Sequence, residues 1–562
     1  MKKHITRLLF AALLLLALCI GASAAGTSGK CGPSAYWSFD SSTGTLTISG
    51  SGAMNDYEYG DYPWMDYRNS IQTIVIGDQI TQIGWNAFPW TACSTIKFGK
   101  NVRSIGERAF NGCRNLNGDL TLPDSVQTIG AGAFQGCEKL SGDLTIPDSV
   151  QTIGDSAFEF CTGLNGTLTL GKNLRTIGKK AFSGCAFTGS LTIPEGITEI
   201  AIGTFSSSRS SGMFTGKLTL PSTLKTIGAS AFSYTDFSGE LLIPDGVTSI
   251  GANAFKECDG FGGTLSLPDS VKTVGEWAFY LCKGFTGLKL SAGLTKIEKL
   301  SFAHMYGLRT EVVIPEGVTE IGESAFSCSY MPSVRLPSTL KKIEKQAFMY
   351  AHNLTKITLP DGLETIGDEA FSGCHPRNAV VLPASIKSIG KKAFDRDGAI
   401  YGNLNEIPVG AYFLGDAPQI VGTGNANCSF PSDWTLYYLP GTSDWTGDTY
   451  EGYQIAPWDG ETRWDNPHTR RFGRDINGNQ IETSWSVNPD TGKITLTDDL
   501  NEGCVVAVSY DAEGRVTGIG VLRTKTDFVI LNLQDTCRLF LLNASSAPRL
   551  NTPITINDYL QT

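Results

Sequence analysis

The chain has 562 residues, with 45 basic and 55 acidic side chains and a net charge of −10 at neutral pH. A nucleic-acid-binding protein is not expected from such an acidic chain, because phosphate groups require a basic surface. The length also excludes one compact hydrophobic core, since such cores stop growing at about 250–300 residues.

Residues 1–24 have the composition of a secretory signal peptide. A basic start, an apolar centre and a small-residue cleavage site follow one another, formed by Lys2, Lys3 and Arg7, by Leu8 to Ile20, and by Ala22 to Ala24. Cys19 offers an alternative, acylation as a lipoprotein, although Leu18 is bulkier than such a site requires. We therefore expect an exported mature protein that begins near Ala25. Cleavage removes three basic residues and no acidic one, so its net charge becomes −13, and no membrane span remains.

Residues 25–70 differ from the segment that follows and are expected to form an N-terminal β cap. Residues 45–48, Thr-Leu-Thr-Ile, alternate between polar and apolar as a strand does. A solenoid needs a cap, because its first coil otherwise exposes an apolar face. The large side chains available for this purpose are Tyr36, Trp37, Met54, Tyr57, Trp64 and Tyr67.

Residues 71–400 repeat one phrase, whose clearest copy is LTLPDSVQTIGAGAFQGCEKL at residues 120–140. The Phe of this phrase recurs fourteen times, with a period of 22 to 24 residues and one interval of 27, at Phe88, Phe110, Phe134, Phe158, Phe182, Phe205, Phe232, Phe255, Phe279, Phe302, Phe326, Phe348, Phe371 and Phe394. A period of this length is typical of solenoids, in which each coil contacts only its neighbours. We therefore predict a β-rich (α+β) solenoid of about 14 coils.

Each copy predicts one short strand followed by a turn. In the segment Leu144-Thr145-Ile146 the two aliphatic side chains point inwards and the threonine outwards, and Pro147 ends the strand because it has no N–H to donate. The turn after Gly154 is expected to be helical or 3₁₀ and to bury the repeat Phe and the Cys three residues later. The clearest members of this structural ladder are Phe110, Phe134, Phe158, Phe182, Cys113, Cys137, Cys161 and Cys185.

Thirteen cysteines remain after signal cleavage, an odd number that first suggests disulfides and one spare thiol. Seven of them stand three residues after a repeat Phe, where most other copies have a small residue. We therefore expect these cysteines to be free and to serve in packing. Disulfides between neighbouring coils are the alternative, because a spacing of about 4.8 Å brings the sulfur atoms within range.

The outward positions of the predicted strands form a row along the solenoid. One interpretation is structural, because Thr favours strands and the hydroxyls of a ladder of Thr side chains can hydrogen-bond to one another. The other is functional, because an extended concave face is the usual binding surface of a solenoid. The candidate partner-binding residues are Lys97, Thr121, Thr145, Thr169, Thr192, Thr219, Leu242, Ser266, Lys289, Val313, Arg335 and Thr358.

The period stops after Phe394, and three further segments follow. We predict a C-terminal cap over residues 401–458, a linker over 459–480 and a small antiparallel, β-sandwich-like domain over 481–562. The densest aromatic cluster lies in the cap and consists of Trp434, Tyr437, Tyr438, Trp445, Tyr450, Tyr453 and Trp458. Aromatic faces can bind sugars, but a terminal cap also needs large side chains for burial, and we favour the second role.

The chain shows no arrangement of residues for catalysis or metal binding. The histidines of the mature chain are scattered and lack partners at ligand spacing: His304, His352, His375 and His468. No combination of Ser, Cys and His suggests an activated nucleophile, and many carboxylates occupy turns. We therefore expect a protein without catalytic activity and without a cofactor.

The repeated phrase is similar to the IPxxVxxIGxxAFxxCxxL pattern of the BspA-like bacterial leucine-rich repeat family. The resemblance extends from Ile71 to Phe394, with mild departures where Ala201, Glu298 and Glu344 replace the repeat Gly; those coils are expected to bend differently. It implies a right-handed coil with short parallel strands and an exported surface protein. It also implies adhesion to an extracellular or cell-surface protein. A carbohydrate-binding surface protein that uses the aromatic C-terminal region is the alternative, and an enzyme confined to the last domain is a third possibility.

Overall fold

The structure, a computed structural model, describes most of the repeat region and the caps, together with the strand backbones of the C-terminal region. The described residues are 27–58, 60–207, 213–374, 380–395, 410–424, 427–432 and 434–457, and the strands between 471 and 555. The predicted signal peptide and most of the predicted linker lie outside them. Among the described residues, no helix is long and apolar enough to cross a membrane.

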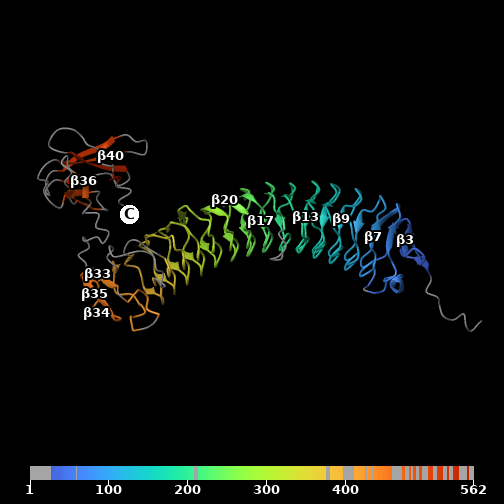
Figure 1. The fold of residues 1–562 in the computed structure, drawn as a ribbon, viewed down its shortest axis with the longest axis horizontal. Helices are drawn as coiled ribbons and strands as arrows, with labels where there is room; N and C mark the ends of the chain where they lie inside the picture. Colours follow the sequence, from blue (N-terminus) through green and yellow to red (C-terminus); the bar gives the residue numbers. More distant parts are fainter. Residues whose placement is uncertain are drawn as a thin grey trace, which may run out of the picture. The chain divides into compact units, whose positions relative to one another are not determined.

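The chain forms two compact units. The first comprises residues up to 375 together with 385–400 and 418–432, and the second comprises residues 376–384, 401–417 and 433–562. In the first unit the coils stand side by side in one row, from β3 through β7, β9, β13 and β17 to β20 (Figure 1). Each coil therefore contacts only its neighbours, as a solenoid requires.

The N-terminal cap is built on the same sheet as the first coils. The strands β1 (Ser28–Lys30), β2 (Ala35–Asp40) and β3 (Thr45–Gly50) are antiparallel, and β3 then pairs in parallel with β5 (Thr73–Ile76), which pairs with β7 (Thr95–Lys97). The cap also contains β4 (Gly52–Ala53) and the 3₁₀ helix η1 (Met65–Tyr67). Because β3 takes the place of a preceding coil, the first coil has no bare apolar end.

The predicted strands form a first ladder of short parallel strands. Its members after β7 are β10 (Leu144–Thr145), β12 (Leu168–Thr169), β14 (Leu191–Thr192), β16 (Leu218–Thr219), β18 (Gly239–Leu242), β20 (Phe261–Ser266), β22 (Phe285–Lys289), β24 (Val312–Val313), β26 (Ser333–Arg335) and β28 (Lys356–Ile357). In the coil of residues 120–122 this segment is not a strand, although Leu120 and Leu122 are buried as expected.

A second parallel ladder, which the sequence analysis did not predict, runs through the Thr-Ile-Gly part of the phrase. It consists of β6 (Ile80–Ile83), β8 (Ser104–Ile105), β9 (Thr128–Ile129), β11 (Thr152–Ile153), β13 (Thr176–Ile177), β15 (Glu199–Ile200), β17 (Thr226–Ile227), β19 (Ser249–Ile250), β21 (Thr273–Val274), β23 (Lys296–Ile297), β25 (Glu320–Ile321), β27 (Lys342–Ile343), β29 (Thr365–Ile366) and β31 (Ser388–Ile389). The turn around the repeat Phe, expected to be helical or 3₁₀, is instead a series of hydrogen-bonded turns. Each coil therefore has three sides: two strands and one turn.

The repeat Phe rings form one buried column through the first unit. Successive rings stack with centroids 5.2 to 5.7 Å apart. The column continues beyond the repeats, because Trp64 stacks on Phe88 at 5.2 Å and Phe430 stacks on Phe394 at 5.3 Å. Aromatic rings from the flanking segments thus complete both ends of the repeat core.

The second ladder is interrupted where the repeat Gly is replaced by Ala201 or Glu298. The strand pairing in the described chain stops between β13 and β15 and again between β21 and β23. The reason is steric: a Cβ atom built on Gly154 lies 2.5 Å from the backbone nitrogen of Ala131 in the preceding coil, so a residue with a Cβ must move away. The Phe rings at these two junctions are 5.6 and 5.7 Å apart.

Glu344 also replaces the repeat Gly, with a smaller effect. Its backbone N–H still donates to the carbonyl of Ile321 at 2.9 Å, and the Phe326 and Phe348 rings are 5.5 Å apart. The coils in which the repeat Gly is replaced therefore lie further from the preceding coil, and this separation, measured between the Phe ring centroids, is largest at Ala201 and Glu298.

The cysteines have a bonding role in addition to packing. The thiol of Cys161 donates to the carbonyl of Phe134 in the preceding coil, at 3.1 Å, and Cys137 and Cys185 repeat this contact. The hydroxyl of Ser329 does the same at 2.8 Å to Phe302. This position therefore selects a small side chain that can donate a hydrogen bond.

All cysteines with described side chains are free, as the sequence analysis expected, and most are fully buried. Burial raises the pKa of Cys161 to about 12, and only the thiolate reacts with alkylating reagents. We expect iodoacetamide to leave the ladder thiols unmodified in the native protein and to modify them after denaturation without reductant. Intact mass measures both states, and the partly exposed Cys428 serves as the internal positive control. Failure to label after denaturation would establish disulfides instead.

The second unit contains a short parallel sheet and then antiparallel strands. The parallel sheet runs β30 (Val380–Leu382), β32 (Gly410–Phe413), β33 (Thr435–Tyr438) and β35 (Tyr453–Pro457), with β34 (Thr449–Tyr450) antiparallel at its edge. The later strands form antiparallel pairs. β36 (Arg471–Arg474), which lies in the range predicted as a linker, pairs with β37 (Gln480–Glu482). The strands within the range predicted for the C-terminal domain are β38 (Trp485–Asn488), β39 (Lys493–Leu496), β40 (Cys504–Tyr510), β41 (Val516–Leu522), β42 (Phe528–Ile530), β43 (Thr536–Leu542) and β44 (Ile554–Thr555).

Candidate binding surface

The outward side chains of the first ladder form a continuous surface, called here the strand face. All twelve candidate residues are exposed: Lys97, Thr121, Thr145, Thr169, Thr192, Thr219, Leu242, Ser266, Lys289, Val313, Arg335 and Thr358. Strand register brings several of them into direct succession, since Leu242 pairs with Ser266, Ser266 with Lys289 and Lys289 with Val313. Their role in binding a partner stays a prediction.

The threonine half of the strand face is chemically uniform. Thr145 pairs with Thr169 and Thr192 with Thr219. Among the hydrogen bonds of the described residues, none joins the hydroxyls of these neighbouring threonines. The threonine side chains therefore do not hydrogen-bond to one another across the coils, contrary to the structural interpretation. These hydroxyls remain open to solvent, but nothing in their arrangement discriminates one ligand from another.

The other half of the strand face is hollowed and carries exposed apolar groups. A hollow of about 560 Å³ is lined by residues of three successive coils, including Leu242, Ser266 and Lys289, with Asp245 and Asp269 among the residues of the adjoining turns. Leu242 is 63% exposed and Val313 is 44% exposed. Among the strands whose side chains are described, these two are the large aliphatic side chains that are exposed, so this half is the better candidate for contact with a partner.

The charges on this half are unevenly paired. Arg335 forms an ion pair with Glu311 at 2.8 Å, whereas no ion pair of the described residues includes Lys289. Lys289 therefore offers an ammonium group at the edge of the hollow, next to the apolar side chain of Val313. The hollow combines apolar surface with a cation and two carboxylates, which is a mixture suited to a protein surface.

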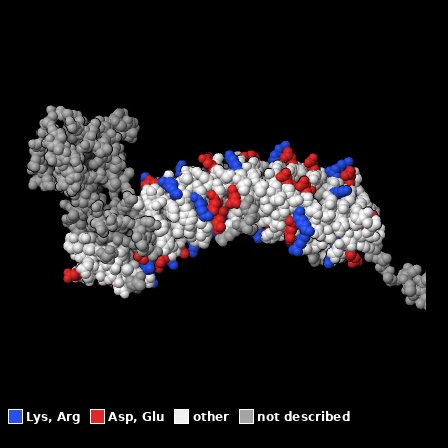
Figure 2. Space-filling model, in the orientation of Figure 1, with Lys and Arg blue, Asp and Glu red and all other residues white. Residues whose placement is uncertain are grey.

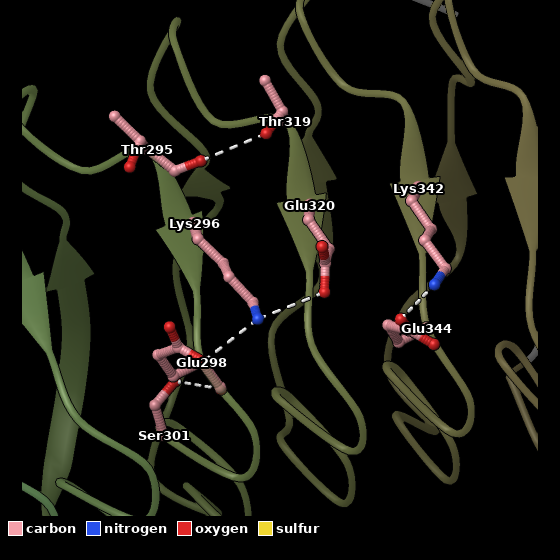
Figure 3. A network of polar contacts seen from close by, with 8 residues as sticks. All are labelled: Thr295, Lys296, Glu298, Ser301, Thr319, Glu320, Lys342 and Glu344. Atoms are coloured by element: carbon pink, nitrogen blue, oxygen red, sulfur yellow. Dashed lines mark hydrogen bonds and ion pairs between the residues drawn. The ribbon is translucent and has the colours of Figure 1, made fainter.

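The second ladder carries a charged network that sequence reasoning missed. Lys296 contacts both Glu298 and Glu320 at 3.3 Å, and Lys342 forms an ion pair with Glu344 (Figure 3). The sequence signal was Lys-Ile-Glu standing twice where other copies have Thr-Ile-Gly or a close variant. Each Glu that replaces the repeat Gly thus has a Lys two residues earlier as its ion-pair partner, and Lys296 also links its coil to the next through Glu320.

Most described side chains of the aromatic cluster near the C-terminus are buried or stacked on one another. Trp434, Trp445 and Tyr453 are buried. Tyr412 and Tyr437 stack at 4.5 Å, and Tyr438 stacks on Trp445 at 5.5 Å. Trp458 lies outside the described residues. Few aromatic faces are therefore left open for a sugar in the described part of this segment.

Catalytic or metal chemistry finds no support in the described part of the chain. No group of three or more His, Cys, Asp and Glu side chains there could hold a metal ion. Burial lowers the pKa of His304, whose Nδ1 lies 2.5 Å from the Tyr306 hydroxyl, so this ring is held in a packed polar contact. On the side of the molecule seen in Figure 2, basic and acidic side chains alternate in small groups and form no large basic patch.

The fold and the strand face together define a class of protein: a parallel β solenoid whose coils repeat one phrase and leave a long strand face open. The chain belongs to the BspA type leucine rich repeat region family. The model of this family matches residues 65–142, 142–261, 210–330 and 263–377, with six copies of the repeat. This confirms the family and the fold class indicated by the repeated phrase.

The chain resembles several solved structures. A leucine-rich repeat protein from Bacteroides ovatus ATCC 8483 is 26% identical, with a TM-score of 0.50, and the match covers 63% of this chain and 94% of that protein. A leucine rich cell surface protein from Faecalibacterium prausnitzii A2-165 is also 26% identical, with a TM-score of 0.36 and coverage of 57% and 92%. A leucine-rich repeat protein from Eubacterium ventriosum ATCC 27560 is 21% identical, with a TM-score of 0.32 and coverage of 67% and 96%. No curated protein matches the chain.

Proposed function

We propose that this protein is an exported, non-enzymatic scaffold that binds an extracellular or cell-surface protein through the strand face, acting in adhesion. The observation that carries the proposal is the exposed row from Leu242 to Arg335, in which Leu242, Ser266 and Lys289 line a hollow and Val313 and Arg335 follow beside it. The predicted signal peptide and the leucine-rich repeat family support location outside the cell.

The chemistry of the hollow favours a protein over a sugar. Leu242 and Val313 offer aliphatic surface, which a partner's apolar side chain can cover, and Lys289 offers a cation at its edge. Desolvated apolar anchors surrounded by polar groups are the usual centre of a protein interface. Carbohydrate binding by the aromatic C-terminal region, the alternative, has few open rings in the described residues.

The test is binding of the full-length mature protein to an array of extracellular matrix and cell-surface proteins, with a glycan array in parallel. For a protein found to bind, we expect the double variant Leu242→Ser, Lys289→Glu to lose at least roughly tenfold in affinity, as loss of interface anchors does. Lys97→Glu makes the same charge change at the far end of the strand face and serves as the matched control.

Two outcomes contradict the proposal. Unchanged affinity of the double variant would place the binding site elsewhere. Binding to glycans alone, insensitive to Leu242 and Lys289, would support the carbohydrate-binding alternative.

A further inference from the structure

The third side of each coil, the turn around the repeat Phe, carries its own exposed aromatic groups and is called here the turn face. The residue two positions after the repeat Phe has a left-handed backbone in most coils. Glycine, which adopts this conformation freely, occupies the position in four coils, at Gly112, Gly136, Gly184 and Gly373. Large rings occupy it in five others, at Trp90, Phe160, Tyr234, His304 and Tyr350.

A large side chain in a left-handed conformation has an energetic cost that the fold does not require, because glycine serves equally well in other coils. Packing explains three of the five. A Cβ atom on Gly112 would lie 2.6 Å from the Trp90 ring, so this ring covers the glycine of the next coil. Phe160 covers Gly184 and Tyr350 covers Gly373 in the same way.

Packing on a glycine does not explain Tyr234 or His304. The next coils have Glu257 and Cys328 at the corresponding position. His304 instead belongs to a group of aromatic side chains on neighbouring turns, and Tyr234 contacts Lys256 at one end of that group. Tyr280 meets His304 at 5.1 Å, and Tyr306 meets both His304 at 5.6 Å and Tyr330 at 5.4 Å.

At one end of this group a lysine is held by three rings. The Lys256 ammonium lies 4.9 Å from the Trp277 ring centroid, 5.6 Å from that of Tyr234 and 5.7 Å from that of Tyr280. Such contacts fix an ammonium group without neutralising its charge. The lysine is partly buried, whereas most described lysines of the solenoid are exposed.

Lys256 also lacks a carboxylate partner. None of the ion pairs of the described residues includes it, whereas Lys283 in the next coil pairs with Asp259 at 2.6 Å. A positioned, partly desolvated and unpaired cation is an anchor for an anion, since a charge-assisted hydrogen bond is stronger than a neutral one. Trp and Tyr beside it are the residues most enriched at the centres of protein interfaces.

We propose that this part of the turn face is a second interaction surface, which binds an acidic segment of a protein partner by placing an Asp or Glu carboxylate on Lys256 and apolar groups against the surrounding rings. A peptide is favoured over an acidic sugar by the ring geometry. Trp277 and Tyr280 are inclined at 58° and Tyr280 and His304 at 70°, so these rings do not form a flat platform on which a sugar ring could stack.

The test selects random phage-displayed peptides on the full-length mature protein, with an array of uronate and sialic acid glycans in parallel. We expect the selected peptides to carry Asp or Glu beside an aromatic or aliphatic residue, and to bind more weakly as salt is raised. Titration calorimetry should show that Lys256→Met and Trp277→Ala bind the selected peptides about tenfold more weakly than the parent does, and that Lys256→Arg keeps the affinity of the parent.

The matched control is Lys272→Met, an exposed lysine next to the second ladder in a neighbouring coil, which should bind as the parent does. Equal melting temperatures of the Lys256 and Lys272 variants show that the fold is intact. Selection of peptides without acidic residues, or equal affinity of Lys256→Met and the parent, overturns the proposal. So does binding of acidic glycans alone. The variants at Leu242 and Lys289 lie on the strand face and should not alter this affinity, so the two surfaces are tested independently.

Discussion

Phe158→Ala is expected to lower the free energy of unfolding by about 3–5 kcal/mol, the usual cost of removing a fully buried aromatic ring. The ring has no exposed surface and stacks on Phe134 at 5.2 Å and on Phe182 at 5.4 Å. Its removal therefore leaves a cavity that two coils share. Urea denaturation followed by circular dichroism measures the loss, and a split transition would show that the solenoid has been cut at this coil.

Phe160→Ala is the matched control, because it removes the same ring two residues away. Phe160 is 53% exposed and touches the backbone of Gly184, so its loss should cost no more than about 1 kcal/mol. Equal losses for the two variants would show that the buried column does not dominate stability.

Gly154→Ala is expected to break the second ladder between β9 and β11 and to cost about 1–3 kcal/mol, as overpacking does. The added Cβ would lie 2.5 Å from the Ala131 nitrogen and 2.7 Å from the carbonyl carbon of Gly130, and backbone atoms cannot rotate away. We expect the coils to separate as they do at Ala201. Loss of the hydrogen bond from the residue 154 N–H to the Ile129 carbonyl, 2.8 Å in the parent, should appear as faster amide exchange.

Gly262→Ala controls for the loss of glycine itself. Only one atom, the carbonyl oxygen of Gly284 at 3.9 Å, lies within 4 Å of its added Cβ, and its backbone is not left-handed. This variant should be neutral or slightly stabilising, because alanine restricts the unfolded chain. A neutral Gly154→Ala would show instead that the coils separate without cost.

Much of the architecture could be predicted from one coil at a time. The alternation in Leu144-Thr145-Ile146 indicated which side chains are inside, and the structure buries Leu144 and Ile146 and exposes Thr145. The spacing of the repeat Phe along the chain predicted the solenoid fold. The second ladder was missed because Thr152-Ile153 is preceded by Gln151 and followed by Gly154, so it lacks the apolar–polar–apolar alternation of Leu144-Thr145-Ile146.

The bonding role of the cysteines was hidden for a related reason. The residues that occupy the Cys161 position in other copies showed that this position favours a small side chain. The hydrogen-bond acceptor of the Cys161 thiol, the carbonyl of Phe134, is however 27 residues away in the chain. The same holds for the three rings around Lys256, which come from the coils on either side of it: Tyr234 from the preceding coil, and Trp277 and Tyr280 from the following one. No local pattern marks such a group.

By itself, the sequence of this protein determined the period, the inside and outside of each coil, and the absence of recognisable catalytic residues. These properties depend on the alternation and spacing of side chains within one copy of the phrase. Only the tertiary structure decided which side chains of successive coils meet: the thiol and the carbonyl, the Lys-Ile-Glu network, the rings on the turn face, and the Trp64 and Phe430 rings that end the core. The physical reason is that these contacts depend on the register between coils, which inter-coil hydrogen bonds and the size of the residue at each bend fix together.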